Sequence, residues 1–236
     1  MAEGTAVTGH AKPFGVVATF AIGAIALLAG QLSGIAALSG WYGLNLSQDG
    51  GAIVLFIFVS APVQLAVLAL AASYKGGAAE YLGFKIPRRS EVVIAVAVLA
   101  AMIVVGDTVS WLAGRHIVDR FQTDIYQAAR SANLLPLLFV AVTVLIPISE
   151  ETLFRGFLFP GWLRSPRHAW PVIILTAALF AIIHVQYDWF LTAQVFAFGV
   201  LFGWIRWATG STILTMLLHG LVNLEGMIET VLTLNS

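Results

Sequence analysis

Three charged side chains, Glu150, Glu151 and Arg155, directly follow a run of mostly apolar residues at 134–149. Placing an acidic side chain at the centre of a bilayer costs about 2.5–3.5 kcal/mol even on the lenient insertion scale, so an ionisable residue in such a place is first considered functional. Residues four positions apart share a helix face, and we therefore expect Glu151 and Arg155 to pair. Glu150 lies about a third of a turn away. Without that partner, it suits the role of a general base or acid.

Two further apolar segments carry polar groups: Phe180-x-x-x-His184 and His219-x-x-x-Asn223. An imidazole and an amide on one helix face can bind a metal, donate to an oxyanion or join neighbouring helices. Taken singly, each group has a structural explanation: a hydrogen-bonded core histidine, a contact between helices, or an ion cluster at a helix end. A bundle that gathers Glu150, His184, His219 and Asn223 around one water-sized cavity would hold a base, a water-positioning partner and oxyanion donors. Hydrolysis of a peptide bond requires those parts.

The composition defines the elements that must position these groups. Hydrophobic residues make up 59% of the 236-residue chain and charged residues 10%, against roughly 45–50% and about 25% in soluble domains. We therefore expect a polytopic membrane protein. With 12 basic and 12 acidic residues, the chain offers no polybasic surface for nucleic acid. The absence of cysteine excludes disulfides, thiolate metal sites and cysteine nucleophiles.

Apolar segments near the length of about 20 residues that spans a bilayer recur along the chain. They predict an all-α transmembrane helix bundle of about seven spans (six to eight), which forms a single membrane domain over 1–236 with an intramembrane polar site and a short N-terminal tail at 1–12. The fourth span is expected to continue to about Phe159, and the stretch 115–133 to be mixed and amphipathic. The predicted spans are 14–38, 52–74, 92–114, 134–149, 170–187, 190–208 and 212–234.

The connections on the N-terminal side of this topology carry 9 Lys and Arg residues, or 8 if Arg155 belongs to the site, and those on the other side carry 3. Basic residues concentrate in cytoplasmic loops. The count predicts a cytoplasmic N-terminus and an external C-terminus.

Taken together and in this order, the motifs resemble those of the CAAX-protease and bacteriocin-processing (CPBP) family, the type II CAAX prenyl endopeptidase group of intramembrane proteases. The family pattern is Glu-Glu-x-x-x-Arg, then Phe-x-x-x-His, then His-x-x-x-Asn or His-x-x-x-Asp. The matching core covers about 134–227, and no motif position departs from the pattern. The matching residues are Glu150, Glu151, Arg155, Phe180, His184, His219 and Asn223.

The resemblance implies a membrane endopeptidase. Glu150 and His184 would activate a water molecule, and His219 and Asn223 would stabilise the tetrahedral oxyanion. Glu151 and Arg155 would hold the first helix end in place. The implied substrate is a peptide or protein in the lipid bilayer, either prenylated or a bacteriocin precursor. The small size and short termini suit the plasma membrane of a prokaryote.

Metal dependence is open at this point. Glu150, His184 and His219 could supply three ligands and leave a fourth position free, as catalytic zinc prefers. The family is commonly described as metalloprotease, yet a glutamate-activated water without metal is an equally coherent mechanism. The His-Glu-x-x-His helix of zincins is absent. We slightly favour the metal-independent site.

Two alternatives follow from the same residues. A non-catalytic membrane protein, such as an immunity or scaffold factor or a proton-coupled transporter, would also use buried Glu and His. An aspartyl intramembrane protease would need Asp107 and Asp188 on facing helices, but Val104 stands where Gly-x-Gly-Asp requires its first glycine. Asp107 is therefore interpreted as a polar contact or a lining residue of the cavity.

Overall fold

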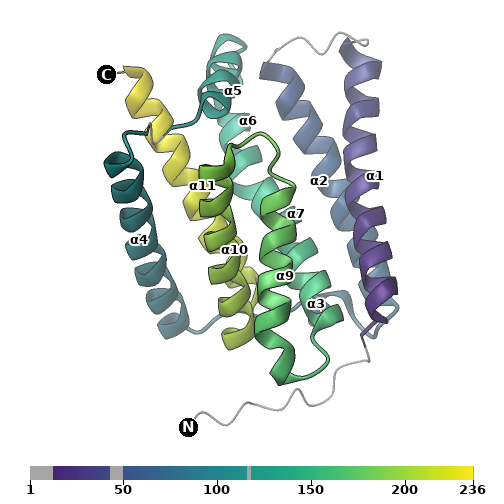
Figure 1. The fold of residues 1–236 in the computed structure, drawn as a ribbon. Coiled ribbons are helices and arrows are strands. Elements are labelled where there is room, and N and C mark those ends of the chain that lie inside the picture. The colour runs from purple at the N-terminus through teal and green to yellow at the C-terminus, as the bar shows by residue number, and fades with distance from the viewer. Residues whose placement is uncertain (1–12, 43–49, 116–117, 236) are drawn as a thin grey trace.

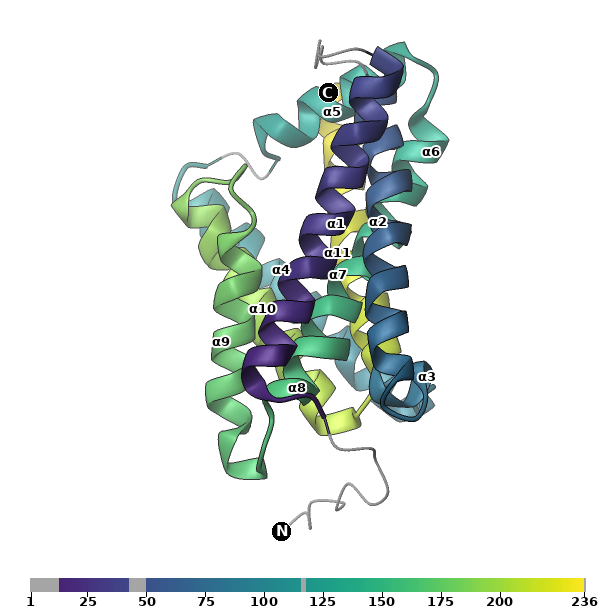
Figure 2. The same ribbon diagram turned by 90° about the vertical axis from the view of Figure 1, so that its right-hand side faces the viewer.

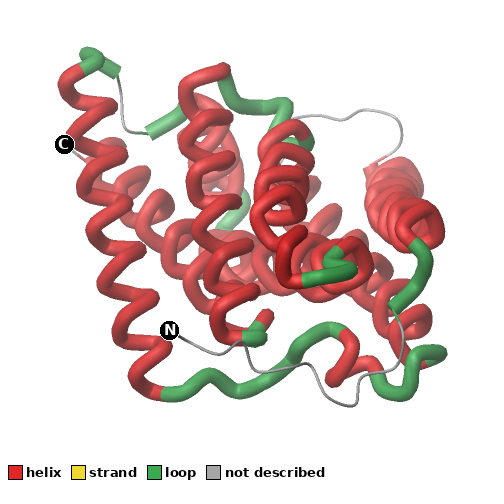
Figure 3. The backbone as a smooth tube through the Cα atoms, turned by 60° about the horizontal axis from the view of Figure 1, so that its bottom comes forward, coloured by secondary structure: helices red, strands yellow, loops and turns green. Residues whose placement is uncertain are grey.

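The structure, a computed structural model, describes residues 13–42, 50–115 and 118–235. The predicted tail at 1–12 lies outside these ranges. The described chain folds into helices joined by short loops, without a strand (Figures 1 and 3). Six helices are long and apolar enough to cross a membrane. The predicted polytopic, all-α bundle is confirmed.

Five of these long helices lie close to their predicted ranges, and the sixth is the interrupted span 135–162 described below. Their apolar residues surround the whole helix circumference, as expected where lipid covers one side and protein the other. They are α1 (Val16–Tyr42), α2 (Gly50–Ser73), α4 (Arg89–Leu112), α10 (Trp189–Thr209) and α11 (Thr212–Asn235).

The predicted span 170–187 is shorter than expected. Helix α9 (Ala169–Ile182) has 14 residues, below the length of about 20 that spans a bilayer. The reason lies in the next helix, because the side chain of Asp188 accepts hydrogen bonds from the backbone N–H groups of Phe190 and Leu191, each at 3.0 Å. Such a cap fixes the start of a new helix, so the preceding residues must form a turn.

The fourth span is a continuous but irregular helical rod from Leu135 to Trp162. Two π-helical segments lie directly before and after the short helix α7 (Ile146–Glu151), which carries both motif glutamates. Single π-helical turns are frequent at functional sites. The other segments of the rod are α6 (Leu135–Val140), η1 (Ala141–Leu145), η2 (Thr152–Leu158) and α8 (Phe159–Trp162).

Helices α1 and α2 form a pair on one side of this rod, and α9 and α10 form a second pair (Figures 1 and 2). Helix α11 packs against the rod and against α10, and α4 covers α10 and α11 from the edge of the bundle. The short α3 (Ala78–Tyr81) follows α2 and contacts it, at the end of the bundle where α1 begins (Figure 2). The amphipathic α5 (Arg120–Ser131), which falls in the stretch predicted to be mixed, lies at the opposite end near the C-terminus. One short 3₁₀ turn, η3 (Pro166–His168), precedes α9.

Two contacts bring the neighbouring helices close to α7. The side-chain amide of Gln64 in α2 donates a buried hydrogen bond of 2.9 Å to the carbonyl of Ser149. On the other side, Gly220 in α11 faces the backbone of η1, where a Cβ would lie 2.7 Å from the carbonyl oxygen of Thr143. A glycine permits this approach because it has no side chain. The approach holds the neighbouring His219 beside the glutamates.

Candidate functional site

Glu151 and Arg155 form the ion pair that their four-residue spacing predicts. The Nη1 atom of Arg155 lies 2.7 Å from Oε1 of Glu151, and both side chains are fully buried. The second terminal nitrogen of Arg155 donates to the carbonyl of Gly199 at 2.9 Å, and the guanidinium lies 4.7 Å from the ring centre of Phe180. The pair thereby joins the rod to α9 and α10, because its polar contacts extend beyond its own helix.

His219 lies against both glutamates. Its Nδ1 atom is 3.1 Å from Oε1 of Glu151, and its Nε2 atom is 3.9 Å from Oε2 of Glu150. The imidazole is buried between aromatic rings, edge-on to Phe180 and stacked on Phe202, with both ring centres 5.6 Å away. Both ring nitrogens therefore face carboxylates while the ring faces contact apolar groups.

Glu150 is less buried than its neighbour, with 22% of its side chain exposed against none for Glu151. A carboxylate that is partly exposed, with an oxygen near an imidazole, can hold a water molecule in hydrogen-bond reach. The two adjacent glutamates thus differ as predicted, since one is paired with arginine and the other is not.

His184 lies just beyond the end of α9, in the turn that leads to α10. Its Nδ1 atom is 2.7 Å from the carbonyl oxygen of Phe180, and a carbonyl can only accept, so Nδ1 carries the proton. In the neutral ring, Nε2 is then an acceptor. The imidazole also contacts Phe180 edge-on, with a centroid distance of 4.8 Å.

Asn223 follows His219 by one helical turn and is partly buried. Its amide nitrogen donates a hydrogen bond of 2.8 Å to the carbonyl of Val142 in η1. A primary amide has two N–H groups. One of them fixes the side chain to the π-helical segment, and the second remains for a ligand.

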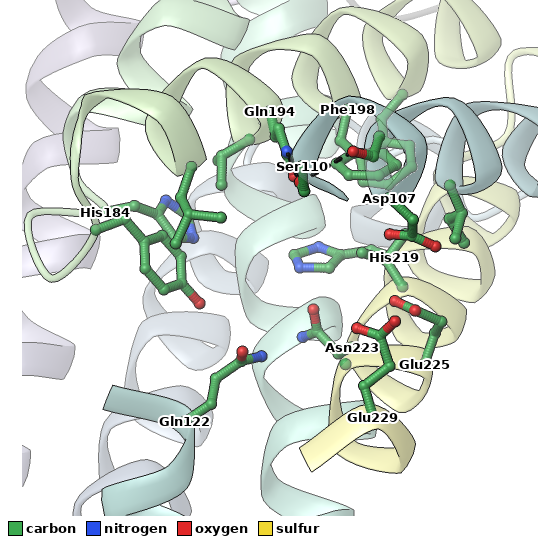
Figure 4. A pocket seen from close by; sticks show the side chains of 18 of the residues that line it. Asp107, Ser110, Gln122, His184, Gln194, Phe198, His219, Asn223, Glu225 and Glu229 are labelled. Carbon is green, nitrogen blue, oxygen red and sulfur yellow. Dashed lines mark hydrogen bonds between the residues drawn. The ribbon is translucent and has the colours of Figure 1, made fainter. Parts of the chain in front are cut away.

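A cavity of about 160 Å³ brings part of the predicted site together. This volume accommodates several water molecules. His184, His219 and Asn223 line the cavity, together with residues of α4, α5 and α10. Figure 4 shows His219 and Asn223 in the middle, with His184 to one side. Glu150 does not itself line the cavity. Its Oε2 atom lies 3.9 Å from Nε2 of His219, which does line the cavity.

Three carboxylates line the side of the cavity opposite His184 in this view (Figure 4). Asp107 belongs to α4, and Glu225 and Glu229 are one turn apart on α11. For Asp107 the sequence predicts either a polar contact or a lining residue of the cavity, and the residue lines the cavity. The sequence motifs assign no role to the two glutamates. The sequence nevertheless indicates them, because two ionisable residues that follow Asn223 within the same apolar span are candidates for a functional role.

The arrangement of possible metal ligands differs from the predicted set. Among the described residues, the one group of three whose ligand atoms lie within 4.8 Å of one another is Asp107, Glu225 and Glu229. Glu150, His184 and His219 form no such group, although two imidazoles and a carboxylate suit zinc chemically. Because their ligand atoms do not all lie within 4.8 Å of one another, those three residues do not fit a three-ligand metal site in this arrangement.

The two aspartates of the alternative aspartyl mechanism do not meet. Asp107 lines the cavity, whereas Asp188 caps α10 and forms an ion pair with Arg115. Asp188 has a structural explanation in these contacts, so the geometry does not favour a pair of catalytic aspartates.

Tyr187 is a further lining residue that the sequence did not indicate. It lies in the turn between α9 and α10, and burial raises the pKa of its hydroxyl to about 12, with the negative charges of Asp119 and Glu150 adding to the effect. The hydroxyl therefore keeps its proton, and the ring brings no charge to His184.

Fold and site together define a helical membrane protein with a buried glutamate–histidine cluster beside a polar cavity. Residues 132–224 match the family of type II CAAX prenyl endopeptidases, Rce1-like. The match contains all seven motif residues and confirms, over this segment, the family predicted from them.

Two curated relatives resemble part of the chain. An uncharacterized 24.3 kDa protein of Escherichia coli is 34% identical over 105 residues, which are 43% of this chain and 47% of the relative. The UPF0177 protein YxdF of Lactococcus lactis is 28% identical over 83 residues, 35% of this chain and 44% of the relative. The chain thus spans about half the length of the curated relatives it matches. No solved structure matches the chain.

Proposed function

We propose that the protein is an intramembrane endopeptidase of the CAAX-protease type. Glu150, with His184 orienting the water, takes a proton from a water molecule, whose oxygen attacks the carbonyl carbon of the scissile peptide bond. His219 and Asn223 stabilise the resulting oxyanion. As the tetrahedral intermediate collapses, the C–N bond breaks and the proton held by Glu150 passes to the leaving nitrogen. The substrate is a peptide or protein that reaches the site from the bilayer, either a prenylated peptide or a bacteriocin precursor.

The observation that carries the proposal is the approach of Glu150 to His219, 3.9 Å between Oε2 and Nε2, at the edge of a cavity that His184 and Asn223 also line. These groups come from three separate segments of an apolar bundle. Burying ionisable side chains in a membrane costs free energy, and residues of this kind are therefore usually functional. The family match over 132–224 supports the same reaction class.

The hydrogen bonds of the two histidines suit different roles. His184 donates from Nδ1 to the Phe180 carbonyl, which leaves the Nε2 lone pair to accept a hydrogen bond from the attacking water. His219 donates from Nδ1 toward Glu151. Its other ring nitrogen, Nε2, lies 3.9 Å from Oε2 of Glu150, and this is the atom that we assign to the oxyanion.

Asn223 complements His219 in this mechanism. One N–H of its amide is bound to Val142, so the side chain is held before substrate arrives. Donors held in place in advance lose little free energy to reorganisation when charge develops on the substrate oxygen. We favour water activation by side chains alone, since Glu150, His184 and His219 are not a group of described residues whose ligand atoms lie within 4.8 Å of one another.

The test compares purified wild-type protein with Glu150→Gln on two reporters, a prenylated CAAX-type peptide and a bacteriocin precursor peptide. General-base catalysis contributes roughly 10²–10⁴-fold, and we expect a loss of that size. Glu80→Gln, which changes an exposed glutamate outside the site, is the matched control and should cleave like the wild type. A zinc chelator should leave the rate unchanged.

Near-wild-type cleavage by Glu150→Gln would overturn the assignment of the base. If neither reporter is cleaved and Glu150→Gln still supports the cellular function of the protein, the non-catalytic alternatives are favoured instead. Those alternatives are an immunity or scaffold factor and a proton-coupled transporter.

A further inference from the structure

His184 is the one proposed catalytic side chain that no helix holds. Helix α9 ends at Ile182, and His184 lies in the following turn. Its backbone N–H donates to the carbonyl of Ala181 at 3.1 Å. The bond from Nδ1 to Phe180 fixes which nitrogen carries the proton, but one hydrogen bond leaves the imidazole free to tilt about it. The ring of Phe180 contacts the imidazole edge-on, with centroids 4.8 Å apart, and a nearly parallel ring would restrain the imidazole plane more directly.

Tyr187 supplies that contact. Its ring is stacked on the imidazole of His184, with centroids 5.9 Å apart and an angle of 14° between the planes. Both side chains line the cavity. An offset, nearly parallel arrangement is one of the preferred geometries of aromatic pairs. The stacked phenol and the Phe180 ring thus restrain the tilt of the imidazole, and the Phe180 carbonyl restrains its rotation.

Tyr187 is itself held on both sides. Its backbone N–H donates to the carbonyl of His184 at 3.1 Å, closing a tight turn. The next residue, Asp188, caps α10 and pairs with Arg115, which lies three residues beyond the end of α4. The tyrosine therefore stands on a turn anchored by two helices, although its own segment is not helical.

We propose that Tyr187 is a positioning residue for His184, whose stacked ring keeps Nε2 of the imidazole directed into the cavity for water activation. The inference rests on the proposed function and adds a residue that belongs to none of its motifs. In this proposal the aromatic face of Tyr187 orients the imidazole of His184. The hydroxyl is neutral because its pKa is raised to about 12, and we assign its proton no part in orienting the imidazole.

Two substitutions separate the ring from the hydroxyl. Tyr187→Phe keeps the ring, and Tyr187→Leu removes the aromatic face. Misplacing a catalytic group by about 1 Å can reduce the rate on the order of 100-fold. We expect Tyr187→Leu to lower kcat by roughly 10- to 100-fold with little change in KM. Tyr187→Phe should restore kcat to the wild-type level. Tyr74→Leu, at a tyrosine that is 87% exposed, is the control.

A second measurement does not depend on activity. The chain has five histidines, so the ring resonances in a spectrum of ¹⁵N-histidine-labelled protein can be assigned to His184 by comparison with His184→Gln. Tyr187→Leu should move the His184 resonances and leave those of His219 in place. Tyr187→Phe should leave both unchanged. If Tyr187→Leu is not recovered folded, Tyr187→Met removes the aromatic face while filling more of the space.

The two readouts distinguish the failure of this inference from that of the proposed function. Unchanged His184 resonances in folded Tyr187→Leu or Tyr187→Met would overturn the inference. A loss of kcat in Tyr187→Phe would also overturn it, because the hydroxyl would then be the active part. Shifted resonances in a protein that cleaves neither reporter would support the contact between the two rings and reject only the proposed peptidase activity.

Discussion

Oε1 of Glu151 lies 3.1 Å from Nδ1 of His219, and the same oxygen lies 2.7 Å from the guanidinium of Arg155. One carboxylate oxygen thus connects the arginine of the first motif to the histidine of the third. The sequence suggested that Glu151 and Arg155 hold a helix end. In the structure both residues lie within the continuous helical rod of residues 135–162, and Glu151 contacts the nitrogen of His219 that faces away from Glu150.

Arg155→Ala should reduce the amount of folded protein. It leaves Glu151 as a charge without its arginine in a fully buried place, and breaking a buried ion pair costs about 3–5 kcal/mol. The measurement is the abundance of the variant in the membrane fraction and its thermal unfolding in detergent. Arg167→Ala, at an exposed arginine, should behave like the wild type.

The double variant Glu151→Leu/Arg155→Leu separates stability from catalysis. Replacing both partners of a buried pair by apolar residues is often neutral or stabilising, so folded protein should return. Cleavage should not return, because His219 has lost its carboxylate. Equal abundance of the wild type and Arg155→Ala would contradict the importance of the pair.

Gly220→Ala should destabilise the bundle next to the site. The new Cβ would lie 2.7 Å from the carbonyl oxygen of Thr143, and overpacking of this kind costs about 1–3 kcal/mol. Gly40→Ala, at a helical glycine with nothing within 4 Å of the added Cβ, should be neutral or slightly stabilising, because alanine favours the helix. A Gly220→Ala protein as stable as Gly40→Ala would show that α11 can shift away from η1.

The ionisation of Tyr187 predicts a pH dependence at the alkaline end. Burial raises the pKa of this tyrosine to about 12, above the value of about 10 in an unfolded chain. The group therefore contributes its full share of stability below about pH 10, and this share is lost as the pH rises through the folded pKa. An ultraviolet titration of wild type minus Tyr187→Phe should show one ionisation near pH 12. A difference centred near pH 10 would mean that the ring is in water.

The distribution of basic residues between the connections predicts that the N-terminus is cytoplasmic. Ser73 and Ser131 are exposed and are the last residues of α2 and α5. The end of α2 and helix α5 lie at opposite ends of the bundle (Figures 1 and 2). Because the chain has no cysteine, Ser73→Cys and Ser131→Cys each introduce a single thiol. A membrane-impermeant maleimide added to intact cells should label Ser131→Cys and reach Ser73→Cys only after lysis. The reverse pattern would place the N-terminus outside.

The sequence by itself determined the parts of this protein that depend on local patterns. Apolar segments of spanning length predicted the bundle. Within a bilayer the backbone N–H and C=O groups must be hydrogen-bonded inside the protein, and an α-helix achieves this within a single segment. The four-residue spacing predicted the Glu151–Arg155 pair, because one helical turn separates the two side chains. The order of the motifs also predicted the family. The roles of the proposed catalytic residues stay predictions until they are tested.

Only the tertiary structure decided which groups meet. His219 and Glu151 are 68 positions apart, and their contact depends on how closely α11 approaches the rod, which Gly220 permits. The same packing places Glu225 and Glu229 beside Asp107 on the wall of the cavity. The cap at Asp188 ends the predicted fifth span early and leaves His184 on a turn beside Tyr187. Such contacts lie between segments, and periodicity within one segment carries no information about them.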